Sequence, residues 1–200
     1  VSLADLDRNL EQLCLAQMRM LTLRVWGADW TSDSIFPALE RNVRKTGDPM
    51  LAAALRTCAA EIDTRTGHPD RARSALISAR RLLRDSPNVF LEGNAAIAGL
   101  CLSLSCCDWN SAIEEGLRAL RCAGESGNLR TELAARLNLG QVNLNQGRLD
   151  DAGRHLDEAL RLCPRGGNAE IGVLDALAQA SLARGDIGQC EDWLRRIDVV

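Results

Sequence analysis

The sequence predicts an all-α fold, a right-handed α-solenoid of about five stacked helical hairpins. Three observations lead to this prediction. Apolar residues recur at intervals of three or four, which places them on one face of a helix. Turn signals lie 38 to 40 residues apart, at Ala28-Asp29, Gly67-His68, Cys107-Asp108, Gly147-Arg148 and Gly185-Asp186. Two alanines seven residues apart follow three of these turns, namely Ala72 and Ala79, Ala112 and Ala119, and Ala152 and Ala159.

A fixed period of this length is the signature of a repeat architecture. We expect a single repeat domain over residues 1–200, with hairpins at about 3–46, 48–85, 88–126, 128–164 and 168–198. The chain starts without Met and ends on apolar residues, so we expect it to be a segment of a longer protein. Apolar side chains left uncovered on the terminal hairpins would favour self-association through them.

The first two hairpins differ in regularity. The first has Pro37 and Glu40 near the positions where the other hairpins have small residues, and terminal repeats are often atypical in this way. The second begins with Asp48-Pro49, a capping side chain followed by the residue best suited to the first turn of a helix. Its second helix carries five arginines, at positions 71, 73, 80, 81 and 84. We interpret them as a solvated outer face; a phosphate or nucleic-acid patch is the alternative, but no aromatic side chain alternates with them.

The third hairpin contains the most apolar helix, with AAIAGLCLSLSCC over residues 95–107. A helix without a polar face is buried on more than one side. We therefore expect this helix in the middle of the array, with neighbours on both sides.

The fourth hairpin is the clearest of the five. Its two amphipathic helices meet at Gly147-Arg148, and Pro164 ends the second helix. Small residues stand where the helices must approach closely, at Gly140 in the first helix and at Ala152 and Ala159 in the second. In the fifth hairpin, Cys190 and Ile197 take the places of the two alanines.

The fourth hairpin resembles a tetratricopeptide repeat (TPR). The matching residues are Asn138, Leu139, Gly140, Gly147, Ala152, Leu156, Ala159 and Pro164. Asn143 and Arg136 depart from the motif, which favours Tyr and Trp there. The long period is similar to that of the repeats in bacterial signal-transducing regulators of the MalT-like family. The resemblance implies a concave groove lined by the first helix of each hairpin.

The same resemblance implies which side chains face the groove. In the second and third hairpins they are Thr57, Glu61, Thr64, Arg65, Ile97, Cys101, Leu104 and Ser105. In the fourth and fifth they are Leu137, Gln141, Leu144, Asn145, Asp175, Gln179 and Leu182. Four of these residues fit interior packing equally well, namely Ile97, Leu104, Leu137 and Leu144.

Composition argues against several classes of partner. The formal net charge of −3 gives no general attraction to nucleic acid or to an anionic membrane. The longest uncharged stretch, residues 93–107, is too short to cross a bilayer. Lys45 is the only lysine among 24 basic residues, which is typical of a bacterial genome rich in G and C. We expect a bacterial cytoplasmic protein with a protein or peptide partner and no direct contact with nucleic acid or membrane.

Eight cysteines raise the question of a disulfide or a zinc site. No two of them have the C-x2-C spacing, and only His68 and His155 could assist in holding a metal. Most lie within helical patterns, where a thiol packs as a small hydrophobe. We expect reduced core cysteines, with no metal and no other cofactor.

The sequence contains no catalytic constellation. Adjacent carboxylates such as Asp150-Asp151 point about 100° apart on a helix, so they do not converge on one substrate atom. The loop from Pro164 to Asn168 has two glycines but lacks the preceding strand and the lysine of a phosphate-binding loop. We expect no enzyme activity.

These observations predict a non-catalytic protein-protein interaction scaffold that binds a peptide or a partner domain in its concave groove. The alternative is an effector-sensing, regulatory TPR region of a bacterial transcription regulator. A DNA-binding or nucleotide-binding domain next to this segment in the parent reading frame would favour the alternative.

Overall fold

The computed structural model describes residues 10–18 and 36–199, and all the regular secondary structure in these residues is helical. The all-α class is therefore confirmed. The chain divides into two compact units, Val1–Leu102 and Ser103–Val200, and each unit is described by itself. The helices are residues 10–18, α2 (Phe36–Thr46), α3 (Pro49–Arg65), α4 (Pro69–Asp85), α5 (Val89–Ser105), α6 (Trp109–Ser126), α7 (Leu129–Asn145), α8 (Leu149–Leu162), α9 (Asn168–Ala183) and α10 (Ile187–Ile197).

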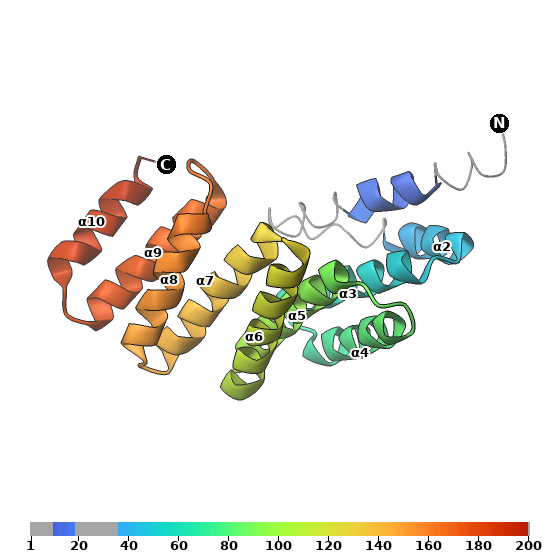
Figure 1. The fold of residues 1–200 in the computed structure, drawn as a ribbon, viewed down its shortest axis with the longest axis horizontal. Helices are drawn as coiled ribbons and strands as arrows, with labels where there is room; N and C mark the ends of the chain where they lie inside the picture. The colour runs from blue at the N-terminus through green and yellow to red at the C-terminus, as the bar shows by residue number, and fades with distance from the viewer. Residues whose placement is uncertain (1–9, 19–35, 200) are drawn as a thin grey trace. The chain divides into compact units, whose positions relative to one another are not determined.

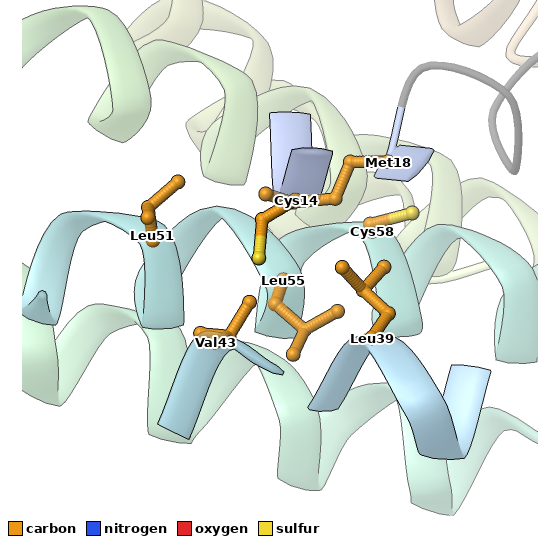
Figure 2. Packing of buried hydrophobic residues seen from close by; sticks show 7 residues of the cluster. All are labelled: Cys14, Met18, Leu39, Val43, Leu51, Leu55 and Cys58. Carbon is orange, nitrogen blue, oxygen red and sulfur yellow. The ribbon is translucent and has the colours of Figure 1, made fainter. Parts of the chain in front are cut away.

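In the first unit, helix 10–18, α2 and α3 share one apolar cluster, and Figure 2 shows the three helices converging on it. Its buried members are Cys14, Met18, Leu39, Val43, Leu51, Leu55 and Cys58. A second cluster joins α3, α4 and α5 through Ala60, Ala72, Leu76, Ala98 and Leu102. The core of this unit is therefore built from aliphatic and sulfur-containing side chains, in keeping with an aromatic content of 3%.

In the second unit, α6 to α10 follow one another in chain order, and each contacts the next (Figure 1). α7 also contacts α9, so the first helices of two successive hairpins are neighbours. The buried cluster between α8 and α9 consists of Leu156, Ala159, Val173, Ala176, Leu177 and Ala180.

Four of the predicted tight turns share one backbone geometry. Their first residue has a positive φ, which is 77° at Gly67, 56° at Cys107, 72° at Gly147 and 78° at Gly185. The residue after it donates its N–H to the carbonyl five positions earlier, over 2.7 to 3.0 Å. This bond closes the end of a helix that is followed by a left-handed residue. Its recurrence confirms a repeat-like architecture, while the predicted turn at Ala28-Asp29 lies outside the described residues.

Small residues stand where the helices approach most closely. All six alanines of the three predicted pairs are 0% exposed. A Cβ on Gly140 would lie 2.6 Å from Cδ2 of Leu156, and a Cβ on Gly116 would lie 2.5 Å from Cδ2 of Leu139. The close approach expected at Gly140 is therefore confirmed, whereas the one at Gly116 was not predicted from the sequence.

The helix starts follow the capping signals of the sequence. The carboxylate of Asp48 accepts the N–H of Met50 at 2.8 Å, and α3 then begins at Pro49 as predicted. Asp108 and Asp186 cap α6 and α10 in the same way. Each cap satisfies one of the N–H groups that a helix leaves without an internal partner.

Candidate partner-binding surface

In the second unit, the groove-facing residues predicted for the fourth and fifth hairpins lie on neighbouring helices, α7 and α9. The predicted residues on one helix are called a stripe. α7 and α9 are in contact, and a Cβ on Gly172 would lie 3.8 Å from Cδ2 of Leu137. Asn145 and Gln179 are exposed and Gln141 is partly exposed. Because Gln179 follows Gln141 by one repeat of 38 residues, an amide side chain occupies the same position in both hairpins.

Each stripe is organised by one side-chain hydrogen bond. Nε2 of Gln141 donates to Oδ1 of Asn145 at 3.1 Å, and Nε2 of Gln179 donates to Oδ2 of Asp175 at 2.8 Å. Both bonds join residues one helical turn apart, so they align the side chains along the helix axis. The Oε1 atoms of both glutamines and Nδ2 of Asn145 remain to accept from and donate to a ligand.

The three predicted leucines of this face do not share one environment. Leu137 and Leu144 are partly buried and pack against the apolar cluster of α8 and α9, so they contribute to the interior. Leu182, in the last turn of α9, is 58% exposed. The face of α7 and α9 is therefore polar, with one exposed apolar side chain near one end.

In the first unit, Arg65 is exposed, and the other predicted residues are partly or fully buried. Thr57 is buried, and its hydroxyl donates to the carbonyl of Ala53 at 3.0 Å. The hydroxyl of Thr64 donates to the carbonyl of Ala60 at 2.8 Å. Ile97 is partly buried, and Thr57 can touch no partner without unfolding of its helix.

Cys101 brings the predicted residues of α3 and α5 together. Burial, with a smaller contribution from the carboxylate of Glu61, raises the pKa of its thiol to about 11, while the guanidinium of Arg65 acts in the opposite direction. These electrostatic interactions place Cys101 close to Glu61 and Arg65. The thiol is protonated at pH 7, so it is a poor nucleophile and a poor metal ligand.

The last two predicted residues lie at the end of α5 in the second unit. Leu104 is partly buried and accepts the N–H of Cys107 at 3.1 Å. Ser105 is exposed, and its hydroxyl lies 3.9 Å from the sulfur of Cys106. They form the end of α5, next to the turn that joins α5 to α6.

The cysteines have three kinds of environment, and none of the eight forms a disulfide. Four are buried, two are intermediate and two are exposed. The exposed ones, Cys106 and Cys107, occupy the turn, because the helical pattern ends before them. The expectation of core cysteines therefore does not extend to this pair.

A shallow hollow of about 360 Å³ on α8 was not predicted from the sequence. It is lined by Arg136, Asp151, Arg154, His155, Asp157, Glu158 and Arg161. Arg154 is paired with Asp151, and Arg161 with Glu158. Burial first and the Arg136 guanidinium second lower the pKa of His155, so its ring is neutral at pH 7. With its charges paired and no Cys, Ser or Thr in its wall, the hollow offers no nucleophile for His155 to activate.

A buried polar bridge at the α7–α8 turn was also missed. Asn143 is 5% exposed; its Nδ2 donates to the carbonyl of Leu139 at 2.7 Å, and its Oδ1 accepts from Nε of Arg148 at 2.8 Å. It thereby ties the end of α7 to the start of α8. The sequence contains a recurrent signal for this position. A small polar residue stands four positions before the first residue of each of the four turns, at Asp63, Ser103, Asn143 and Ser181.

Within residues 10–18 and 36–199, no three His, Cys, Asp or Glu side chains are grouped as a metal ion would require. No helix in the same ranges combines the length and apolar character of a membrane span.

Comparison with known proteins gives a likeness of fold. No family model matches the sequence, and no curated protein matches it. Among solved structures, the chain is similar to the crystal structure of BtubC (BKLC) from P. vanneervenii, with a TM-score of 0.66. The match covers 99% of this chain and 90% of that chain, at 17% sequence identity. A likeness at this identity shows a shared fold alone.

Proposed function

We propose that this chain is a non-catalytic interaction scaffold that binds an extended segment of a partner protein across α7 and α9. The observation that carries the proposal is the pair of neighbouring helices with amide side chains at equivalent positions, Gln141 and Gln179. We further propose that the hairpins form one TPR-like, right-handed solenoid, which would make this face part of a concave groove.

The chemistry of the face suits a peptide backbone. An extended peptide presents N–H and C=O groups in alternation, and it needs both acceptors and donors from its receptor. The amide oxygens of Gln141 and Gln179 supply acceptors, and Nδ2 of Asn145 supplies a donor. Leu182 offers an apolar contact for one side chain of the partner.

The structure narrows the proposed set of contact residues. Thr57 is excluded by burial, and Leu137 and Leu144 serve chiefly in packing. Within α7 and α9, the residues proposed to touch the partner are Gln141, Asn145, Asp175, Gln179 and Leu182.

The test uses a displayed library of random extended peptides, selected on the parent chain. Because their side chains are wholly or partly exposed, Gln141→Ala, Asn145→Ala and Gln179→Ala should each change stability by less than about 0.5 kcal/mol. The same substitutions should weaken binding of the selected peptides, because each removes a hydrogen-bonding group from the proposed site. Isothermal titration and thermal melting measure the two effects.

Matched controls come from the core of the same hairpin. Leu139 and Leu156 are 1% and 0% exposed, so truncation of either to Ala should cost about 2–5 kcal/mol. Binding per folded molecule should stay the same in these two variants at a temperature where they are folded. If the three amide variants bind the peptides as tightly as the parent does, the proposed surface is wrong.

A further inference from the structure

The outward side of α4 carries a row of arginines around an exposed aliphatic residue. The helix buries Ala72, Leu76, Ala79 and Leu83. Arg73, Ile77, Arg80, Arg81 and Arg84 lie together on a flank of the helix away from these residues, and this set is named here the α4 arginine face. At 100° and 1.5 Å per residue, this face spans about 100° of the helix and about 16 Å of its length.

The charge of this face is opposite in sign to that of the whole chain. α4 holds five arginines and two aspartates, whereas the chain as a whole has a formal net charge of −3. The aspartates stand at its two ends, as Asp70 and Asp85, and no carboxylate lies between them on the helix. Arg73 forms an ion pair with Asp70 at 3.0 Å, with side chains that are 58% and 97% exposed. Such an exposed pair is weak, so it does not cancel the positive potential of the face.

The ligand of a positively charged face can be a nucleic acid or an acidic peptide, and the side chain of Ile77 distinguishes the two. It is 63% exposed and lies near the middle of the face. Single-stranded nucleic acid is bound by aromatic rings that stack on bases, and α4 has no aromatic residue. An aliphatic side chain between guanidinium groups instead fits an apolar side chain flanked by carboxylates, because arginine binds carboxylates through two parallel hydrogen bonds.

We propose that the α4 arginine face binds an acidic peptide segment in which an apolar residue is flanked by Asp or Glu. This site is separate from the surface proposed on α7 and α9, and its partner is recognised by charge rather than by backbone hydrogen bonds. Each of the two proposals can therefore fail without the other.

The experiment measures fluorescence anisotropy of a labelled peptide in which a central Leu is flanked by glutamates. A matched peptide has Gln in place of every Glu. The protein variants are Arg73→Glu with Arg84→Glu, and separately Ile77→Ala. The control is Arg118→Glu with Arg121→Glu on α6, because both of these side chains are exposed and the change in charge is the same. Melting temperatures establish that each variant is folded.

The acidic peptide should bind the parent at least about tenfold more tightly than the Gln peptide. Charge reversal at Arg73 and Arg84 should weaken binding of the acidic peptide by more than about tenfold. Ile77→Ala should weaken it about threefold, and charge reversal on α6 should weaken it less than about twofold. Affinity should fall as salt rises from about 50 to about 300 mM, because screening shortens the reach of the charges. Equal losses in the α4 and α6 variants, no binding of the acidic peptide, or tighter binding of a labelled oligothymidine than of the peptide would each overturn the proposal.

Discussion

Gly140 and Gly116 show how single residues set the distance between helices in the second unit. The space that a Cβ would need is occupied by the buried side chains of Leu156 and Leu139. A leucine held against a glycine in this way acts as a knob in a hole of the facing helix. The two contacts fix the register of α6, α7 and α8.

Gly140→Ala should destabilise the protein by up to about 2 kcal/mol. Alanine normally stabilises a helix by about 1 kcal/mol relative to glycine, but overpacking a filled core costs about 1–3 kcal/mol. Chemical denaturation measures the difference.

Gly124 on α6 is the matched control, because a Cβ there would meet no atom within 4 Å. Gly124→Ala should therefore stabilise the protein by about 0.5–1 kcal/mol. The destabilisation by Gly140→Ala should shrink when Leu156 is also truncated to Ala. An additive double variant would mean that the contact is not the cause.

Cys101 should make the stability of the protein depend on alkaline pH. Its pKa is about 11 in the folded chain, compared with the ordinary value of 9.0. The folded state therefore keeps a proton that the unfolded state loses, so stability should decrease as the pH rises from about 9 to about 11. Two pKa units correspond to about 2.7 kcal/mol.

The measurement is the free energy of unfolding at pH 8, 9, 10 and 11 for the parent and for Cys101→Ala. Tyrosine is absent and lysine occurs once, so the groups that titrate in this range are chiefly the eight cysteines, and the comparison with Cys101→Ala isolates the contribution of Cys101. The variant should lose less stability than the parent does between pH 9 and pH 11. The same pH dependence in both proteins would show that Cys101 does not carry the effect.

At the scale of helices and turns, the four hairpin turns share one backbone geometry, and one of them has a residue other than glycine at the left-handed position. Three of the four turns use glycine at the left-handed position, whereas the α5–α6 turn uses Cys107 at φ 56°. A residue with a Cβ is strained in this conformation by about 1–2 kcal/mol. The bond from Asp108 N–H to the carbonyl of Ser103, at 2.9 Å, still forms.

Cys107→Gly should therefore stabilise the protein by up to about 1 kcal/mol, after the greater flexibility of glycine in the unfolded chain is subtracted. The reciprocal change, Gly147→Ala at φ 72°, should destabilise it by about 1 kcal/mol or more. Thermal melting of the two variants compares them directly. A loss of stability in Cys107→Gly would contradict the assignment of strain to this residue.

The sequence predicted the helices and turns well because their signals are local. Proline, glycine and capping residues act on their own segment, so Asp48-Pro49 and the four described turns could be placed without knowledge of the fold. Contacts between helices are not local. The close contact at Gly116 depends on which helices become neighbours, so the sequence pattern did not reveal it. The bridge from Asn143 to Arg148 spans only five residues, and it was missed because the polar residue before each turn was not recognised as a signal.

At the scale of the whole molecule, the candidate site was predicted only in part. The spacing of four and seven residues identified one stripe on each first helix, and on α7 and α9 that stripe carries the exposed amides. Spacing alone did not separate exposed residues from packed ones, because Leu137 and Leu144 fall on the same stripe as Gln141, and the buried Thr57 falls on the predicted stripe of α3. Self-association through the terminal hairpins stays a prediction; exposed apolar residues of α10, such as Ile187 and Leu194, are where it would occur.

The most direct test of the proposed function is nitrogen-15 NMR of the side-chain amide groups, with and without a peptide selected on the parent chain. The NH2 signals of Gln141, Asn145 and Gln179 should shift on binding, because these groups are proposed to bond the peptide backbone. The NH2 signal of Asn110, an exposed residue on α6, should stay in place. Unchanged signals from all three groups, at a peptide concentration that saturates the protein, would contradict a binding surface on α7 and α9.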